Sequence, residues 1–368
     1  MDRATVVGID GGGTYTRAVA ADVSGQALAA VQTGAASPNK TPHAEENVRQ
    51  AIREVVAAAG RPLSDVVALV AGMAGLDSPQ DRVWADRFLA LPELNCPRIP
   101  VNDAVVAHAG ALASRPGIIA ISGTGSIIFG VTEDGTHLRN YDFHHYSSTA
   151  ARHLAYDAVY QILSWRIQPE DVELVEEILA FWEVDDLSIL RQMGTSGFIA
   201  DSFERHRRFG EMAPLVTAAA ERGIPVAEEV CDRAAEQLAT GIALIGGCFR
   251  EDTVEVALIG GAIRSPYLQR AVERALGWHP KTEYRIVEPL LSGAGGAALM
   301  ALEAAGYLVR FCPGGVADNL STTHKWVPAP CPKRRGGTGI TPPPSPLPSE
   351  GRGNGMLAEG LRLSRLRP

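Results

Sequence analysis

Short apolar runs that end in glycines alternate with helical patterns along most of the chain. One apolar run from Thr5 to Asp10 ends in three glycines, and a second run covers Arg17 to Asp22. Runs of this length beside Gly-rich turns are typical of strands. Helical periodicity follows over Ala44 to Gly60, and another strand pattern covers Val66 to Ala71. The pattern predicts an α/β fold that opens with a strand, a glycine turn and a second strand.

The opening pattern returns after Gly117. A strand pattern runs to Ser122, a turn of glycines and hydroxyls follows to Ser126, and Ile127 to Val131 forms a second strand. When the two copies are aligned, Thr14 matches Ser126. A repeat inside one chain predicts two related lobes that face each other. The alternative is a chance match between two short Gly-rich turns.

The expected domains follow from the order of the remaining elements. Residues 4–112 form an N-terminal lobe that a helix over residues 293–306 completes. Residues 113–292 form a C-terminal lobe, whose middle, residues 150–249, has mostly helical periodicity and is a helical insertion. The proline-rich end, residues 313–368, is expected to be disordered, with a polyproline ligand for a partner domain as the alternative.

Composition is that of an ordinary globular protein. The 368 residues are 46% hydrophobic and 21% charged, and the net charge is −8. No overall basic field therefore favours nucleic acid or an anionic membrane. The cysteines lack zinc-ligand spacing, the N-terminus lacks a signal-peptide pattern, and no apolar run is long enough to span a bilayer. We expect a cytoplasmic protein, where ATP is available.

The first glycine turn reads Asp10-Gly11-Gly12-Gly13-Thr14. Glycines leave backbone N–H groups unobstructed, so such a turn can wrap phosphate oxygens. Asp10 at the strand end can hold Mg²⁺ through water, because this ion sheds its water reluctantly. The Thr14 hydroxyl can donate to phosphate. A hairpin with a flexible glycine turn is the alternative.

Two further glycine turns also follow apolar strands. Ser122-Gly123-Thr124-Gly125-Ser126 is a second phosphate-type turn, and Gly260-Gly261 allows close approach of another chain or ligand. These turns are not a P-loop, because the chain has no G-x-x-x-x-G-K-S/T sequence. The run Gly293 to Ala298 formally fits a dinucleotide signature, but no βαβ unit follows it, so close helix packing is the better interpretation. Three such turns favour a nucleotide site over chance.

Asn102 and Asp103 follow the predicted strand Arg98 to Val101. A carboxylate at this place can accept the proton of an attacking hydroxyl. Phosphoryl transfer needs that base together with alignment and charge neutralisation. The alternative is that Asp103 only caps the helix predicted over Ala104 to Ala113.

These segments together resemble a known family. DGGGT, NDA, SGTGS, GGAIRSPY and LLSGAGGAALMAL, in this order and spacing, are similar to the BadF/BadG/BcrA/BcrD-type ATPases. That family includes N-acetylglucosamine kinase and belongs to the actin/hexokinase/heat-shock ATPase superfamily. The resemblance covers about residues 4 to 306 and implies two ribonuclease-H-like lobes that close on ATP. It also suggests a homodimer.

The resemblance implies a role for each site residue. Asp10 would serve Mg²⁺, and Asp103 would be the general base toward a sugar hydroxyl. ATP would contact Gly11, Gly12, Gly13, Thr14, Ser122, Gly123, Thr124, Gly125, Ser126, Gly260 and Gly261.

The chain departs from the amino-sugar kinases of this family in two places. Those enzymes carry a G-W-G…G-D-E-G-S stretch with an acidic sugar ligand, where this chain has residues 139–148 instead. The sugar-binding Asn is also displaced. Adjacent histidines in a strand point to opposite faces, so His144 and His145 are not expected to share a metal ion. We expect an intact ATP site and an altered acceptor site, with contacts from Asn39, Asn102, Asp142 and His144.

The leading hypothesis is a kinase that transfers the γ-phosphoryl group of ATP to a hydroxyl of an amino sugar, of the N-acetylglucosamine or glucosamine type. One alternative is an ATPase that acts on a protein partner, like the dehydratase activators of the family. Those hold an iron–sulfur cluster with closely spaced cysteines, and Cys231 and Cys248 lack that spacing. Another alternative is a sugar or nucleotide sensor without turnover.

Overall fold

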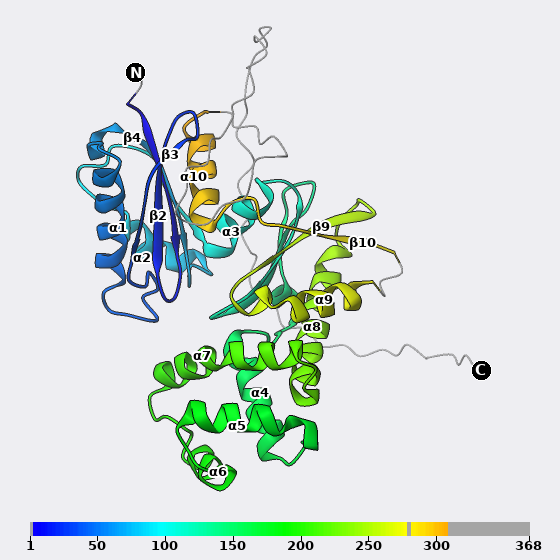
Figure 1. Cartoon of the computed structure of the whole chain (residues 1–368). Coiled ribbons are helices and arrows are strands. Elements are labelled where there is room, and N and C mark those ends of the chain that lie inside the picture. Colours follow the sequence, from blue (N-terminus) through cyan, green and yellow to red (C-terminus); the bar gives the residue numbers. More distant parts are fainter. Residues whose placement is uncertain (1–2, 278–280, 308–368) are drawn as a thin grey trace, which may run out of the picture. The chain divides into compact units, whose positions relative to one another are not determined.

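The computed structural model describes residues 3–277 and 281–307, and it confirms the predicted α/β fold (Figure 1). The described residues include two five-stranded sheets, with strand orders β3-β2-β1-β4-β5 and β10-β9-β6-β7-β8. Residues 313–368, which were predicted to be disordered, lie outside the described residues. No helix in the described ranges is long and apolar enough to cross a membrane.

The first sheet surrounds the first glycine turn. Its strands are β1 (Thr5–Gly11), β2 (Thr16–Asp22), β3 (Ala27–Thr33), β4 (Val66–Met73) and β5 (Arg98–Asn102). β1 and β2 form an antiparallel hairpin, whereas β4 and β5 run parallel to β1. The carboxyl ends of parallel strands lie at one edge of a sheet, which is where ligands bind in such sheets. This edge therefore brings Asp10 and Asn102 together.

The second sheet repeats this plan. Its strands are β6 (Gly117–Ser122), β7 (Ser126–Val131), β8 (His137–Arg139), β9 (Thr253–Ile259) and β10 (Glu283–Val287). β6 and β7 form an antiparallel hairpin around the second glycine turn, and β9 and β10 run parallel to β6. β6 thus takes the place of β1, and each later strand takes the place of its counterpart. The repeat predicted from two glycine turns extends over five strands.

The helices pack on the faces of these sheets. They are α1 (Ala44–Ala58), α2 (Arg82–Phe88), α3 (Asp103–Leu112), α4 (Ala151–Leu163), α5 (Val172–Trp182), α6 (Leu187–Thr195), α7 (Ser202–Glu221), α8 (Pro225–Gly246), α9 (Pro266–Leu276) and α10 (Gly293–Ala304). α1 and α2 share a core with one face of the first sheet, and α3 and α10 share a core with the other. Helices α4 to α8 confirm the helical pattern of the middle of the chain.

Helix α3 contacts both sheets. Its Val106 packs in a core with Val6 and Val70 of the first sheet, while its Leu112 packs in a core with Ile119 of the second sheet. Its contact with α10 is very close, because a Cβ added to Gly296 would lie 2.1 Å from the Val106 carbonyl oxygen. The close-packing interpretation of the Gly-Ala run is therefore confirmed. A helix held on both sides gives Asp103, its first residue, a fixed position.

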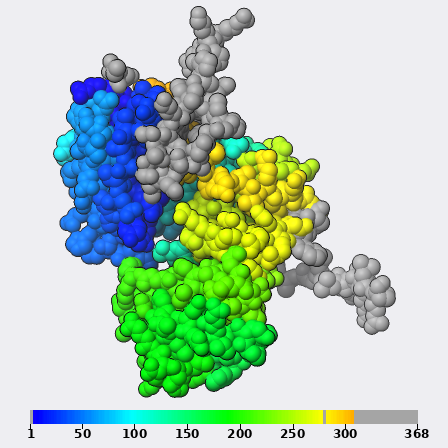
Figure 2. Space-filling model, viewed as in Figure 1, coloured from blue at the N-terminus to red at the C-terminus, as the bar shows by residue number. Residues whose placement is uncertain are grey.

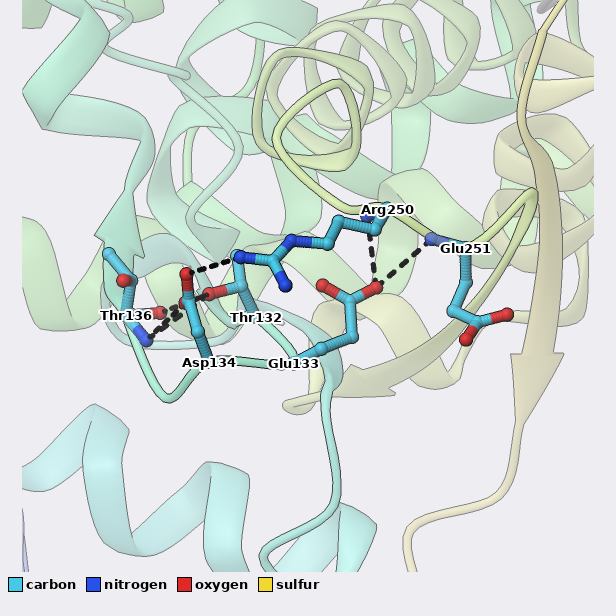
Figure 3. A network of polar contacts seen from close by, with 6 residues as sticks. All are labelled: Thr132, Glu133, Asp134, Thr136, Arg250 and Glu251. Carbon is cyan, nitrogen blue, oxygen red and sulfur yellow. Dashed lines mark hydrogen bonds and ion pairs between the residues drawn. The ribbon is translucent and has the colours of Figure 1, made fainter.

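The helical middle of the chain has its own apolar core. Residues of α4 to α9 pack there with one face of the second sheet, and Figure 2 shows α4 to α7 as one continuous green body. A polar network fixes the segment that leads from α8 into β9 (Figure 3). Glu133 accepts hydrogen bonds from the backbone N–H groups of Arg250 and Glu251 at 3.0 and 3.1 Å. These bonds tie that segment to the β7–β8 turn.

Candidate functional site

The first glycine turn is closed by backbone hydrogen bonds. The N–H of Gly12 donates to the Tyr15 carbonyl at 2.9 Å, and the Gly12 carbonyl accepts from Ala36 at 3.0 Å. Thr14 is exposed. Lys40 lies beside this turn, because a Cβ added to Gly13 would be 3.7 Å from its Cγ. The structure thus adds to the predicted phosphate turn a lysine that sequence reasoning missed.

Asp10 lies at the end of β1, against the start of α10. A Cβ added to Gly293, the first residue of α10, would lie 2.6 Å from the Asp10 carboxylate. Burial raises the pKa of Asp10, and the nearby charge of Arg17 partly opposes this. A cation would relieve the cost of charging such a half-buried carboxylate. One carboxylate together with phosphate oxygens and water is the coordination that Mg²⁺ favours.

Asp103 opens α3 but does not provide its cap. The side chain of Asn102 is the N-cap, since its Oδ1 accepts from the Ala104 N–H at 2.9 Å. The cap interpretation of Asp103 is therefore wrong. Burial raises the pKa of Asp103 to about 6, and repulsion from Asp10 and Asp77 adds to the shift. Asp103 is thus a carboxyl group that titrates close to neutral pH.

Asp77 was missed by sequence reasoning. The Asn102 side-chain N–H₂ donates to Asp77 Oδ1 at 2.9 Å and to the Leu76 carbonyl at 3.3 Å. Asn39 lies next to the same turn, since a Cβ added to Gly75 would be 3.3 Å from its Nδ2. The structure brings the predicted acceptor contacts Asn39 and Asn102 to the ends of β4 and β5. Glycines at the end of β4 were the signal that could have pointed to this turn.

The second glycine turn is anchored by its serines. The Ser126 hydroxyl donates to the Ser147 carbonyl at 2.8 Å, and the fully buried Ser122 hydroxyl donates to the Thr149 carbonyl. Thr124 and Gly125 are exposed at the tip. Sequence reasoning treated all three hydroxyls alike, whereas the structure uses two of them to hold the turn. Phosphate contacts of this turn remain a prediction.

The third glycine turn packs directly on the second. Gly260 has a φ of 119°, and a Cβ there would lie 2.2 Å from the Ser122 carbonyl oxygen. A side chain at this position would therefore force the two turns apart. Gly261 faces open space, with nothing within 4 Å of an added Cβ. The structure brings Gly260 and Gly261 to the second turn, and their contact with ATP remains a prediction.

The altered segment after β8 is not a strand. It forms a short 3-10 helix, Asn140–Phe143, and His144 follows with a φ of 54°. The strand geometry assumed for the two histidines is therefore wrong, and His144 is exposed. Asp142 accepts from the backbone N–H of Arg139 at 2.8 Å and pairs with its guanidinium at 3.0 Å. Acceptor contacts by Asp142 and His144 remain predictions.

Tyr141 comes from the same segment and lies near the acids. Its hydroxyl donates to the Ser126 carbonyl at 2.5 Å. Burial raises the pKa of Tyr141, and the negative charges of Asp77 and Asp103 contribute. Sequence reasoning named Asp142 and His144 here and overlooked Tyr141, because nothing in the local pattern marks which side chain turns toward the acids.

The arrangement suits phosphoryl transfer. Glycine turns border a group of carboxylates at the end of the first sheet, and Asp103 lies near enough to Asp10 for their charges to interact. Among the described residues there is no group of three His, Cys, Asp or Glu side chains able to hold a metal ion by themselves. A metal ion at Asp10 would therefore also need oxygens from phosphate and water.

Comparison with known families supports the resemblance seen in the glycine turns. Residues 7–165 match the sequence model of the BadF/BadG/BcrA/BcrD ATPase family. This range includes the first and second glycine turns and Asp103, and it ends before Gly260. The resemblance that these residues suggested is confirmed.

Two named kinases and one solved structure are similar to this chain. The chain is 26% identical over 237 residues to N-acetylmuramic acid/N-acetylglucosamine kinase of Clostridium acetobutylicum, covering 63% of this chain and 76% of that protein. It is 29% identical over 148 residues to N-acetyl-D-glucosamine kinase of Dictyostelium discoideum, covering 37% and 46% of the two chains. A Chromobacterium violaceum structure assigned as an N-acetylglucosamine kinase matches with a TM-score of 0.61 and 25% identity, over 81% of this chain and 99% of that one.

Proposed function

We propose that this chain, whose residues 7–165 match the BadF/BadG/BcrA/BcrD ATPase family, is an ATP-dependent sugar kinase whose acceptor is an amino sugar. Kinase activity toward a sugar rests on the family and on the named relatives. The amino-sugar acceptor rests on relatives that are kinases of N-acetylglucosamine and N-acetylmuramic acid. The role of Asp103 as the general base rests on its position and on its pKa.

The observation that carries the proposal is the environment of Asp103. Its pKa of about 6 results first from burial and then from repulsion by Asp10. A general base works best when its pKa lies near the working pH, because it is then largely deprotonated and still basic. An ordinary exposed Asp would be a weaker base. Asp103 would take the proton of the acceptor hydroxyl as the hydroxyl oxygen attacks the γ-phosphorus and ADP leaves.

The other residues would position the reactants. The backbone of Gly11 to Thr14 and the tip of the second turn would hold phosphate oxygens, and Asp10 would hold Mg²⁺ through water. Bound Mg²⁺ would neutralise charge on the phosphate oxygens. Lys40, which lies beside Gly13, would add a further positive charge. The acceptor would lie near Asn39, Asp77 and Tyr141, where its hydroxyl can reach Asp103.

The experiment is ADP release measured with a panel of amino sugars for the wild type and for Asp103→Asn. We expect sugar-stimulated turnover in the wild type and a loss of about a hundredfold to ten-thousandfold in the variant, the usual contribution of a general base. Nucleotide affinity should remain within about threefold, because the phosphate turns are intact. ADP release that is independent of sugar and equal in both proteins would refute the kinase and favour an ATPase.

A further inference from the structure

A pocket of about 560 Å³ lies among α4, α6 and α7, in the helical middle of the chain. None of the residues assigned above to ATP or to the acceptor lines it. Its walls combine the aromatic rings of Tyr156, Tyr160 and Phe198 with the basic side chains of Arg191, Arg205 and His206. Pockets of about 300–1,000 Å³ with apolar walls and a few polar groups are typical of small-molecule sites.

The two arginines have no carboxylate partner within the described part of the chain. Arg205 donates to the Ile199 carbonyl at 2.7 Å, and Arg191 donates to the Leu163 carbonyl. These bonds fix the guanidinium groups at the wall without neutralising their charge. By contrast, Arg207 on the same helix forms ion pairs with Glu204 and Glu211 on the surface. No acidic residue lines the pocket, so it presents uncompensated positive charge.

The positive charge extends from the pocket toward the second glycine turn. Partial burial lowers the pKa of His206, and the charges of Arg152 and Arg205 lower it further. Lys40, which lies beside the first glycine turn, contributes to the same effect. Arg152 in turn donates to the Thr124 carbonyl at 2.7 Å. Basic groups therefore connect the pocket with both turns that are proposed to hold phosphate.

We infer that this pocket binds a small organic anion, a carboxylate or phosphate carried on a sugar-sized ring. Fixed guanidinium groups bind such oxyanions with two parallel hydrogen bonds, and the tyrosine and phenylalanine rings can pack on the apolar face of a ring. The anion can come from two sources. It can be an acidic substituent of the acceptor itself, which rests on the proposed kinase function, or a separate sugar phosphate that regulates the enzyme.

The test is calorimetric binding to the full chain without ATP, with N-acetylmuramic acid and N-acetylglucosamine 6-phosphate as anionic probes and N-acetylglucosamine as the neutral probe. We expect Arg205→Gln to weaken binding of at least one anionic probe by about tenfold to a hundredfold and to leave the neutral probe unchanged. Arg207→Gln is the matched control, because Arg207 lies on the same helix as Arg205 and does not line the pocket. It should bind the probes as the wild type does. Arg191→Gln, with an unchanged circular dichroism spectrum, repeats the test if Arg205→Gln does not fold.

Turnover measurements then distinguish the two sources. If the acceptor carries the anion, Arg205→Gln raises KM for N-acetylmuramic acid and not for N-acetylglucosamine. If the anion is a regulator, the variant loses only its response to added N-acetylglucosamine 6-phosphate. The inference is overturned if neither anionic probe binds the wild type, or if the arginine and control variants bind equally. Because binding is measured without turnover, a protein that binds the anions and transfers no phosphate would refute the proposed kinase and leave this inference standing.

Discussion

The two sheets share one plan, yet they carry different chemistry at matching places. β1 and β6 each lead into a glycine turn and a hairpin, and each pairs with one parallel strand that pairs in turn with a second. At the end of β1 stands Asp10, a half-buried acid beside the start of α10. At the same position of β6 stands Ser122, whose hydroxyl is bonded to the Thr149 carbonyl. At this position the first sheet therefore carries an acid, and the second carries a neutral group that holds its turn in place.

The difference teaches how a repeated scaffold can serve two roles. In the first sheet, Asp103 follows the outer parallel strand β5 and is close enough to Asp10 to feel its charge. In the second, the residue that follows the outer strand β10 is Glu288, an acid that is exposed rather than half-buried. Phosphoryl transfer needs both a base for the attacking hydroxyl and a firmly positioned nucleotide. We interpret the first lobe as the source of the base, the metal ligand and one phosphate turn, and the second lobe as the source of the other phosphate turn.

The largest effect is expected at Asp10. Asp10→Asn removes the proposed Mg²⁺ ligand, and we expect turnover to fall about a thousandfold, because a metal ion supplies several kcal/mol of charge stabilisation. The measurement is kcat over a Mg²⁺ titration. Ser122→Ala, the matching position, is the control. It should lower the free energy of unfolding by about 1–3 kcal/mol through its lost buried hydrogen bond and leave kcat within about threefold. Equal losses of turnover in both variants would contradict the division of roles.

A smaller effect is expected at Lys40, which lies beside Gly13. Lys40→Ala removes a positive charge beside the first turn, and charge-assisted hydrogen bonds contribute about 1.5–3 kcal/mol. We expect kcat/KM for ATP to fall about tenfold to a hundredfold, with KM for the sugar unchanged. Lys281→Ala, at an exposed lysine of the other lobe, should have no effect. A wild-type kcat/KM in Lys40→Ala would remove this lysine from the phosphate site.

The inner part of the fold could be predicted from the sequence, whereas the edges could not. Buried strands such as β1 and β6 have continuous apolar runs, and α5 has the helical period over the predicted range Val172 to Trp182. The edge strands β3 and β10 were not predicted. Their residues are mostly half-buried or exposed, so they lack the apolar run of a buried strand. The short strand β8 has only three residues.

The site could be predicted where backbone chemistry defines it. Glycines and strand-end acids leave a signal in the sequence, and the structure brings them together at sheet edges. Asp77, Lys40 and Tyr141 were missed because each lies in a connection whose path depends on packing between distant elements. The same reason explains the wrong strand assumption for His144, since the turn after β8 depends on Asn140, whose side chain donates to the His145 carbonyl at 2.7 Å.

The central claim is that Asp103 is a half-buried base with a raised pKa, and a stability measurement tests it together with activity. Its pKa of about 6 in the folded protein lies above the ordinary value of 3.8. The stability that the neutral carboxyl provides is therefore present below the ordinary value and is lost as the pH rises through about 6. Asp103→Asn avoids that loss, and its gain in the free energy of unfolding should grow between pH 4 and pH 8 to as much as about 3 kcal/mol.

The deciding measurement is urea unfolding of Asp103→Asn and wild type from pH 4 to pH 8, with sugar-stimulated ADP release assayed on the same samples. We predict a variant that becomes more stable than the wild type as the pH rises and that has lost sugar-stimulated turnover. A variant whose stability difference does not change with pH, and which still phosphorylates the sugar, would contradict the role of Asp103 as a general base with a raised pKa.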